Sequence, residues 1–386
     1  MKFRAERVAL VRLLNRLGGI PIRKASMDVL KNVCFEADDT SLVLRVTDLE
    51  VSLTATMLEG LEVNQPGSAS MDYKQITELL RACTSEQVEI EVDSKTHFVI
   101  ESDGSRYRFP GQWGDVWPGS LFAEDRVAKF TATAEDLGKA LSDVQHAVSS
   151  DPHRYNLNGI CIQVGEAIRA AATDGHRLAT TSVPFMKADA ERFEGLPFIV
   201  PTKGSHEMRK LLDTAAEDEQ IRVTVNYTEK DESKEARGLS MMVGDISLSV
   251  RFVEGRFPDI QQVMPQEWAH EIEVSRRDLL GSLRRLGVFA KEFDGIALSL
   301  DGNVLEMSLM TAGHGEGAES IPVAKAEVSG DQDPQPTGLT LPYLKDALDA
   351  QSEDALRIKI NDPLTPVGIG AEGSPTHAVI MPRRLR

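Results

Sequence analysis

Residues 2–10 read KFRAERVAL, and the same order of apolar and polar positions returns at residues 129–137 (KFTATAEDL) and 271–279 (EIEVSRRDL). Each copy begins with an alternating stretch, which is typical of a strand, and passes into apolar positions at helical spacing. A second amphipathic segment follows in each unit, starting at Asp72, Pro201 and Pro342. Both landmarks recur at steps of about 130 and 140 residues, a period far too long for a solenoid, so each copy is a whole domain.

Between the expected helices lie short alternating segments that predict strands, among them Leu42–Val46, Val88–Val92 and Ala355–Ile360. Two helices and several antiparallel strands per unit indicate an α+β domain used three times. We expect the domains to span residues 1–125, 126–267 and 268–386. The polar stretches 229–236 and 329–337 are expected to be exposed loops. Ser275 with Asp278 places an N-cap oxygen and an acid at the start of one helix.

Composition is that of an ordinary globular protein, with 41% hydrophobic and 27% charged residues among 386. Three scattered cysteines are too few for a disulfide framework or a metal site, so neither a metal nor another cofactor is expected. No apolar run approaches the roughly 20 residues that cross a bilayer. The N-terminal residues carry charges where a signal peptide would be apolar, so we expect a cytoplasmic protein with no membrane partner.

The net charge of −17 argues against nucleic acid at first sight, but its distribution is uneven. The first and fifth helix candidates, residues 4–24 and 276–292, carry an excess of arginine and lysine, and acidic residues concentrate in strands and loops. This asymmetry suggests one surface that meets phosphates and another that repels them. Contacts to phosphates alone would be weak and would slide, and a closed ring would supply the missing residence time.

Four segments then appear in order: residues 154–160 (RYNLNGI), 172–179 (ATDGHRLA), 254–260 (EGRFPDI) and 379–385 (VIMPRRL). In sequence, order and spacing they resemble the bacterial DNA polymerase III beta subunits, the sliding clamps, and the run 47–50 (TDLE) fits as well. Any one segment is weak, whereas four in order are specific, and the resemblance covers the whole chain.

The resemblance implies that two chains close head to tail into a ring of six similar domains, with helices lining the hole and sheets outside. It implies a non-catalytic processivity subunit, associated with the nucleoid. The implied partners are a second copy of the chain, duplex DNA bound without sequence preference, the polymerase III alpha subunit, the clamp-loader delta subunit and other proteins that carry clamp-binding motifs.

The resemblance also implies an apolar pocket for short peptides between the second and third domains. Carried over by motif, its residues are Leu157, Thr173, Gly175, His176, Arg177, Leu178, Pro258, Val263, Leu364, Pro366, Met381, Pro382, Arg383 and Leu385. Leucine, valine, methionine and proline offer anchor sites for a peptide, and glycine permits close backbone approach. Without the resemblance, the same apolar residues would be taken for ordinary domain core.

Position suggests two further sets of residues. The candidates for DNA contact follow the first helix, lie in the loop before residue 156, or begin the helix after Pro201: Arg23, Lys24, His153, Arg154, Tyr155 and Lys203. The candidates for the dimer interface come from the first and third domains: Tyr107, Phe109, Val288, Phe289, Ile296 and Leu298.

Three alternatives stay open from the residues alone. Asp174 with His176, or Cys161 with His176, would make the chain a hydrolase, yet no nucleophile elbow or phosphate loop accompanies them. Asp48 with Glu50 would be half of a metal-dependent nuclease site, although no second acidic motif completes it. A repeat-built protein scaffold without a DNA role is the third.

Overall fold

The computed structural model describes residues 1–21, 27–119, 122, 126–230, 233–265, 267–288, 290–291, 294–311, 313–329 and 334–384. The chain divides into two compact units. The N-terminal unit comprises Met1–Glu135, Met186–Leu196 and Lys203–Phe252, and the C-terminal unit comprises Asp136–Phe185, Pro197–Thr202 and Val253–Arg386. The three-domain boundaries expected from the repeats remain a prediction.

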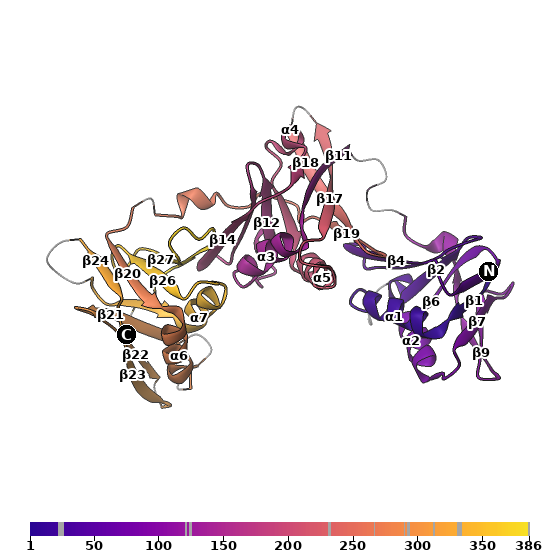
Figure 1. The fold of residues 1–386 in the computed structure, drawn as a ribbon, viewed down its shortest axis with the longest axis horizontal. Coiled ribbons are helices and arrows are strands. Elements are labelled where there is room, and N and C mark those ends of the chain that lie inside the picture. The colour runs from indigo at the N-terminus through magenta and orange to yellow at the C-terminus, as the bar shows by residue number, and fades with distance from the viewer. Residues whose placement is uncertain are drawn as a thin grey trace. The chain divides into compact units, whose positions relative to one another are not determined.

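All six expected helices are present among the described residues. α1 and α2 lie side by side in the N-terminal unit, and α6 and α7 do so in the C-terminal unit (Figure 1). A short helix, α4 (Ala190–Phe193), was not predicted. The six are α1 (Arg7–Leu17), α2 (Tyr73–Ala82), α3 (Ala134–Gln145), α5 (Thr202–Leu212), α6 (Arg276–Leu286) and α7 (Leu341–Asp349).

Apolar spacing and caps explain where these helices form. In α1 the buried residues are Leu10, Leu13, Leu14 and Leu17, which form one stripe along the helix. The Ser275 hydroxyl accepts a hydrogen bond from the Asp278 amide at 3.2 Å, so the predicted N-cap of α6 is confirmed.

Two sheets form the described part of the N-terminal unit. The first has five strands in the order β5-β1-β7-β8-β9, so β9 is an edge strand. The second has ten strands in the order β10-β6-β2-β3-β4-β19-β18-β17-β11-β15. The strands are β1 (Lys2–Glu6), β2 (Asn32–Ala37), β3 (Leu42–Thr47), β4 (Val51–Met57), β5 (Leu61–Gln65), β6 (Gly67–Asp72), β7 (Gln87–Val92), β8 (His97–Ser102), β9 (Ser105–Pro110), β10 (Gln112–Trp113), β11 (Arg126–Thr133), β15 (Lys187–Ala188), β17 (Gln220–Lys230), β18 (Ser233–Val243) and β19 (Ile246–Arg251).

The described part of the C-terminal unit also has two sheets. Nine strands run in the order β16-β12-β13-β14-β28-β27-β26-β20-β24, and four run in the order β23-β22-β21-β25. The strands are β12 (Gly159–Val164), β13 (Ile168–Thr173), β14 (Arg177–Val183), β16 (Phe198–Pro201), β20 (His270–Ser275), β21 (Gly295–Asp301), β22 (Val304–Thr311), β23 (Gly315–Pro322), β24 (Lys325–Val328), β25 (Thr337–Thr340), β26 (Ala355–Ile360), β27 (Val367–Gly370) and β28 (His377–Ile380).

Three sequence predictions about these elements were wrong. The described residues of the stretch 229–236 are not a loop: β17 runs to Lys230 and β18 starts at Ser233, with Glu229 opposite Lys234. The first and fifth helices are shorter than predicted, because residues 4–6 belong to β1 and α6 ends at Leu286. Pairing with neighbouring strands decides the two strand segments, and the Gly287 C-cap ends α6. None of the described helices is long and apolar enough to cross a membrane.

Candidate functional site

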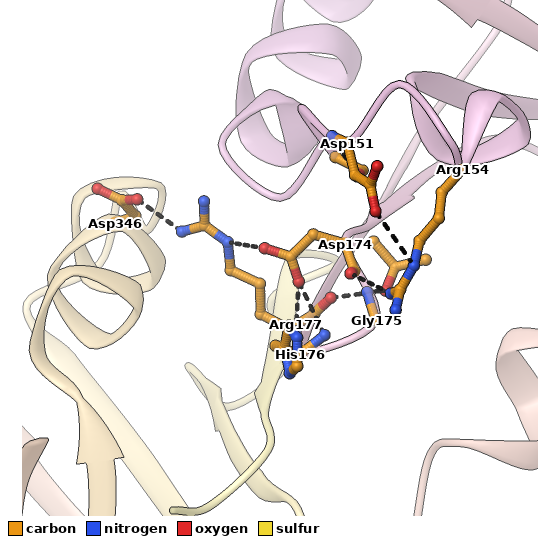
Figure 2. A network of polar contacts seen from close by, with 9 residues as sticks. Asp151, Arg154, Asp174, Gly175, His176, Arg177 and Asp346 are labelled. Carbon is orange, nitrogen blue, oxygen red and sulfur yellow. Dashed lines mark hydrogen bonds and ion pairs between the residues drawn. The ribbon is translucent and has the colours of Figure 1, made fainter. Parts of the chain in front are cut away.

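The turn between β13 and β14 is held by its own side chains (Figure 2). The Asp174 carboxylate accepts hydrogen bonds from the amides of His176 at 2.8 Å and Arg177 at 2.9 Å. The Thr173 hydroxyl accepts one from the Gly175 amide at 3.1 Å and donates one to the Arg177 carbonyl at 2.7 Å. Threonine and aspartate at these positions therefore fix the backbone without help from outside.

Gly175 sits at the tip of this turn with φ of +86°, a left-handed conformation that glycine adopts without strain. A Cβ atom there would lie 2.5 Å from an Arg154 guanidinium nitrogen. That guanidinium donates to the Asp174 carbonyl at 3.1 Å and pairs with Asp151 at 3.6 Å. The glycine therefore leaves room for an arginine side chain beside the turn.

Arg177 connects the turn to α7. Its Nε pairs with Asp174 at 3.1 Å, its Nη1 pairs with Asp346 at 2.6 Å, and its guanidinium carbon lies 4.4 Å from the centre of the Tyr343 ring. Both carboxylates and the aromatic face stabilise the same cation.

His146, just after α3, faces this network and is largely buried. Burial, and then the positive charge of Arg177, lower the pKa of His146 to about 4. Asp346, Asp143 and Asp174 oppose that shift without cancelling it. The ring is therefore neutral near pH 7 and does not compete with Arg177 for its carboxylates.

Several apolar side chains of the C-terminal unit are exposed, and one of them is bonded to the turn. Tyr155 is 60% exposed, Val263 45%, Leu364 72% and Met381 39%. The Met381 amide donates to the His176 carbonyl at 2.8 Å, which fixes this methionine to the turn. Val367 pairs with Ile380, so Pro366 falls opposite Met381 in the continued register.

The remaining residues predicted for the pocket differ in burial and in the segments where they lie. Leu157 and Leu178 are buried, 7% and 4% exposed. Pro258 and Pro382 lie in irregular segments, and the Arg383 amide bonds to the Gly338 carbonyl at 2.8 Å. Leu385 lies outside the described residues.

Two models from one protein family match this chain. A model of the N-terminal domain of DNA polymerase III beta subunits matches residues 1–119, and a model of the central domain matches residues 131–259. The chain belongs to the DNA polymerase III beta subunit family. As a member it is a DNA sliding clamp, a non-catalytic subunit that gives a DNA polymerase its processivity.

Named relatives agree along the whole chain. The Escherichia coli K12 beta sliding clamp is 27% identical, with each chain fully covered. The Bacillus subtilis sliding clamp has a solved structure with a TM-score of 0.88 at 21% identity, again with full coverage of both chains. A Bartonella birtlesii clamp solved with griselimycin bound has a TM-score of 0.87 at 21% identity over both full chains.

The turn at residues 173–177, called the clamp turn from here on, has a second copy in the N-terminal unit, between β3 and β4. The Asp48 carboxylate accepts from the amides of Glu50 at 3.0 Å and Val51 at 2.7 Å, as Asp174 does in the first turn described. Thr47 repeats the bonds of Thr173, and the Arg251 amide donates to the Glu50 carbonyl at 2.7 Å. In this copy Leu49 takes the left-handed conformation, with φ of +77°.

The residues predicted to contact DNA in this clamp divide into three groups. Arg23 and Lys24 lie outside the described residues. His153 and Tyr155 are exposed on the loop before β12, whereas Arg154 is bonded to the clamp turn. Lys203 forms an ion pair with the largely buried Asp48, so its ammonium group already has a partner.

One predicted dimer contact is corrected by the structure. Ile296 and Leu298 are 0% and 2% exposed, and β21 is paired on both sides by β22 and β25, so they belong to the core. Among the described residues the edge strands of this sheet are β23 and β25, and Arg383 bridges to β25 at Gly338. Tyr107 and Phe109 do lie on an edge strand, β9, and Val288 is 79% exposed, while Phe289 lies outside the described residues.

The hydrolase alternatives find no support in the described residues. Cys161 lies in β12, and burial raises the pKa of its thiol to about 12, which keeps it protonated. Asp48 and Asp174 both serve as turn caps. No group of three or more His, Cys, Asp or Glu side chains in the described ranges is placed to hold a metal ion.

Proposed function

We propose that two copies of this chain close head to tail into a ring around duplex DNA, with three domains per chain at residues 1–125, 126–267 and 268–386. The ring would slide on the nucleoid in the cytoplasm. Its partners would be the polymerase III alpha subunit, the clamp-loader delta subunit and other proteins with clamp-binding motifs.

The observation that supports peptide binding is the exposed Met381, which is bonded to the turn at residues 173–177. Met381 is exposed and its amide is bonded to the turn, and two further residues of the predicted pocket, Val263 and Leu364, are exposed as well. Apolar anchors on a fixed backbone suit a short peptide with apolar side chains. The proposed site comprises the residues of the predicted pocket, with Arg177 as support.

Charge supports the choice of edges for the dimer. The edge strand β9 carries Arg106 and Arg108, which pair with Glu101 and Asp93. The edge strand β23 carries Glu316 and Glu319, of which Glu319 pairs with Arg285. These internal pairs reduce the attraction, but the two edges still differ in sign and can complete each other's backbone hydrogen bonds. We propose β9 of one protomer against β23 of its partner, with Tyr107, Phe109, Val288 and Phe289 packing at the junction.

For DNA we propose contacts from Arg23, Lys24, His153, Arg154, Tyr155 and Lys203. Arg154 and Lys203 already hold acidic partners, which would reduce their contribution to the salt dependence of binding.

Ring closure is tested by light scattering over a dilution series and by retention on DNA. We expect a mass near twice 42.4 kDa, and loaded protein that stays on a closed circle and leaves it after linearisation. Equal loss from circular and linear DNA would refute the topological mechanism.

Peptide binding is tested with an array of overlapping peptides that covers the polymerase III alpha subunit of the same organism. The tightest peptide, labelled with fluorescein, then reports affinity by anisotropy. Leu364→Glu should weaken binding at least tenfold, because it places a charge among apolar anchors. Leu58→Glu is the matched control, since Leu58 is 66% exposed and Leu364 72%.

The C-terminus gives a second test of the same site. Deleting residues 381–386 should abolish polymerase stimulation and leave the dimer intact, because Met381 is bonded to the turn. Loss of the dimer would show that these residues serve the interface.

A further inference from the structure

The two turns of this chain are closed onto helices by ion pairs of opposite polarity. In the N-terminal unit the turn supplies the acid, Asp48, and the first turn of α5 supplies the cation, Lys203. In the C-terminal unit the turn supplies the cation, Arg177, and α7 supplies the acid, Asp346. Val51 takes the position in the N-terminal turn that Arg177 takes in the C-terminal turn, so only the C-terminal turn of these two has a cation there.

Arg177 has its contacts inside the protein. Its side chain is 13% exposed, two carboxylates accept from its Nε and Nη1, and the Tyr343 ring covers one face. Two of its nitrogens are engaged by carboxylates, one of them at 2.6 Å, and little of the side chain is left exposed to a ligand. Arg177 is therefore built to hold the turn.

The turn also positions Met381, an apolar anchor of the proposed peptide site. His176 follows Gly175 at the tip, and its carbonyl accepts from the Met381 amide at 2.8 Å. Asp346 is thus connected to Met381 through Arg177 and the backbone of residues 176–177. Losing the Arg177–Asp346 pair would free the turn to move away from α7 and take Met381 with it.

We propose that Arg177 and Asp346, with Tyr343 as the stacking surface, are positioning residues of the peptide site: they set the distance of the turn and of Met381 from α7 and do not bond to the peptide. This inference rests on the proposed peptide binding. It assigns a role in affinity to Asp346, a residue outside the predicted pocket.

The test measures the affinity of the labelled alpha-subunit peptide for variants of the full-length protein. Asp346→Asn and Arg177→Met should each weaken binding about tenfold, the usual effect of losing a hydrogen bond to a charged group. The double variant should bind the peptide no more weakly than the weaker-binding single variant, because both substitutions break the same Arg177–Asp346 pair. Asp346→Glu, which keeps the charge, should restore most of the affinity.

A matched control lies on the same helix. Asp349 is 44% exposed against 38% for Asp346, and its partner Lys345 lies 3.9 Å away on α7 itself. Asp349→Asn should leave peptide affinity within twofold of the wild type. A loss equal to that of Asp346→Asn would assign the effect to α7 as a whole and overturn the proposed pair.

A second measurement separates positioning from general damage. In spectra of the methionine methyl groups without peptide, Asp346→Asn should shift the Met381 resonance and leave those of the N-terminal unit unchanged. Unchanged affinity in Asp346→Asn together with a loss in Arg177→Met would show that Arg177 contacts the peptide directly, and would overturn the inference alone. A wild-type protein that binds no peptide of the array would overturn the proposed function, and this inference with it.

Discussion

His146 should make the stability of the C-terminal unit depend on pH in the range where carboxylates do not yet titrate. In the folded protein, burial and then the charge of Arg177 lower the pKa of this imidazole from 6.5 to about 4. The unfolded chain regains the ordinary value. A depressed pKa means that the unfolded state binds the proton first, so the stabilisation is complete above pH 6.5 and is lost as the pH falls toward 4.

The size of the effect follows from those two values. Between about pH 7.5 and pH 5.0, linkage gives a loss of about 2 kcal/mol in the free energy of unfolding. Aspartates and glutamates of the unfolded chain titrate mainly below this window. Burial, and then nearby Lys359, also lower the pKa of His377, which adds a loss of the same sign.

The assay is urea unfolding of wild type and His146→Gln at both pH values. Replacing Trp113 and Trp117 by Phe leaves Trp268, which lies against Gly368, as the reporter of the C-terminal unit. His146→Gln should reduce the pH-dependent loss by about 2 kcal/mol and leave the contribution of His377 in place. The His146 Nδ1 has no hydrogen-bond partner in the described structure, so glutamine costs no known bond there.

A difference between wild type and variant below about 0.5 kcal/mol would refute the reasoning, because it would mean that His146 titrates alike in both states. A direct check uses labelled histidine in NMR spectra of the folded protein. The His146 resonance should stay that of a neutral ring down to pH 5, and a midpoint near 6.5 would contradict the buried environment.

Three further outcomes are expected. Asp143→Ala should destabilise the C-terminal unit by about 2–3 kcal/mol, measured through Trp268, because the carboxylate is buried and accepts from the Thr181 hydroxyl at 3.0 Å and the Thr376 hydroxyl at 2.7 Å. Leu49→Asn should raise the melting temperature of the N-terminal unit by relieving about 1 kcal/mol of strain at φ +77°, and a lower value would show that the leucine packing outweighs it. Ser275→Ala should cost about 1 kcal/mol in urea unfolding, since it removes the N-cap bond of α6, whereas Ser275→Thr should retain most of it.

Local patterns in the sequence were sufficient for most of the secondary structure. The alternation at residues 355–360 predicts a strand, and β26 spans Ala355–Ile360. Leucines at helical spacing predict α1, and Ser275 marks the start of α6. These features are encoded within a few residues, because a strand repeats every two positions and a helix every 3.6.

The pairing of Glu229 with Lys234 and the burial of Ile296 could not be predicted from such local patterns. Glu229 and Lys234 look like loop residues, yet they pair across two long strands. Ile296 lies in an alternating segment that suits an edge or a centre equally well, and only its pairing with β22 and β25 makes it interior. Sheet order depends on neighbours distant in sequence, which periodicity does not contain.

The features of the candidate site also fall into two kinds, those encoded by neighbouring residues and those that depend on tertiary packing. The sequence by itself determined the threefold α+β repeat and the Thr-Asp turn at 173–177, whose hydrogen bonds join residues at most four positions apart. Only the tertiary structure decided that Arg177 pairs with Asp346, 169 positions away, and that Lys203 pairs with Asp48, 155 positions away. An ion pair forms wherever packing brings two charged side chains within a few ångströms, and the order of residues along the chain does not fix that distance.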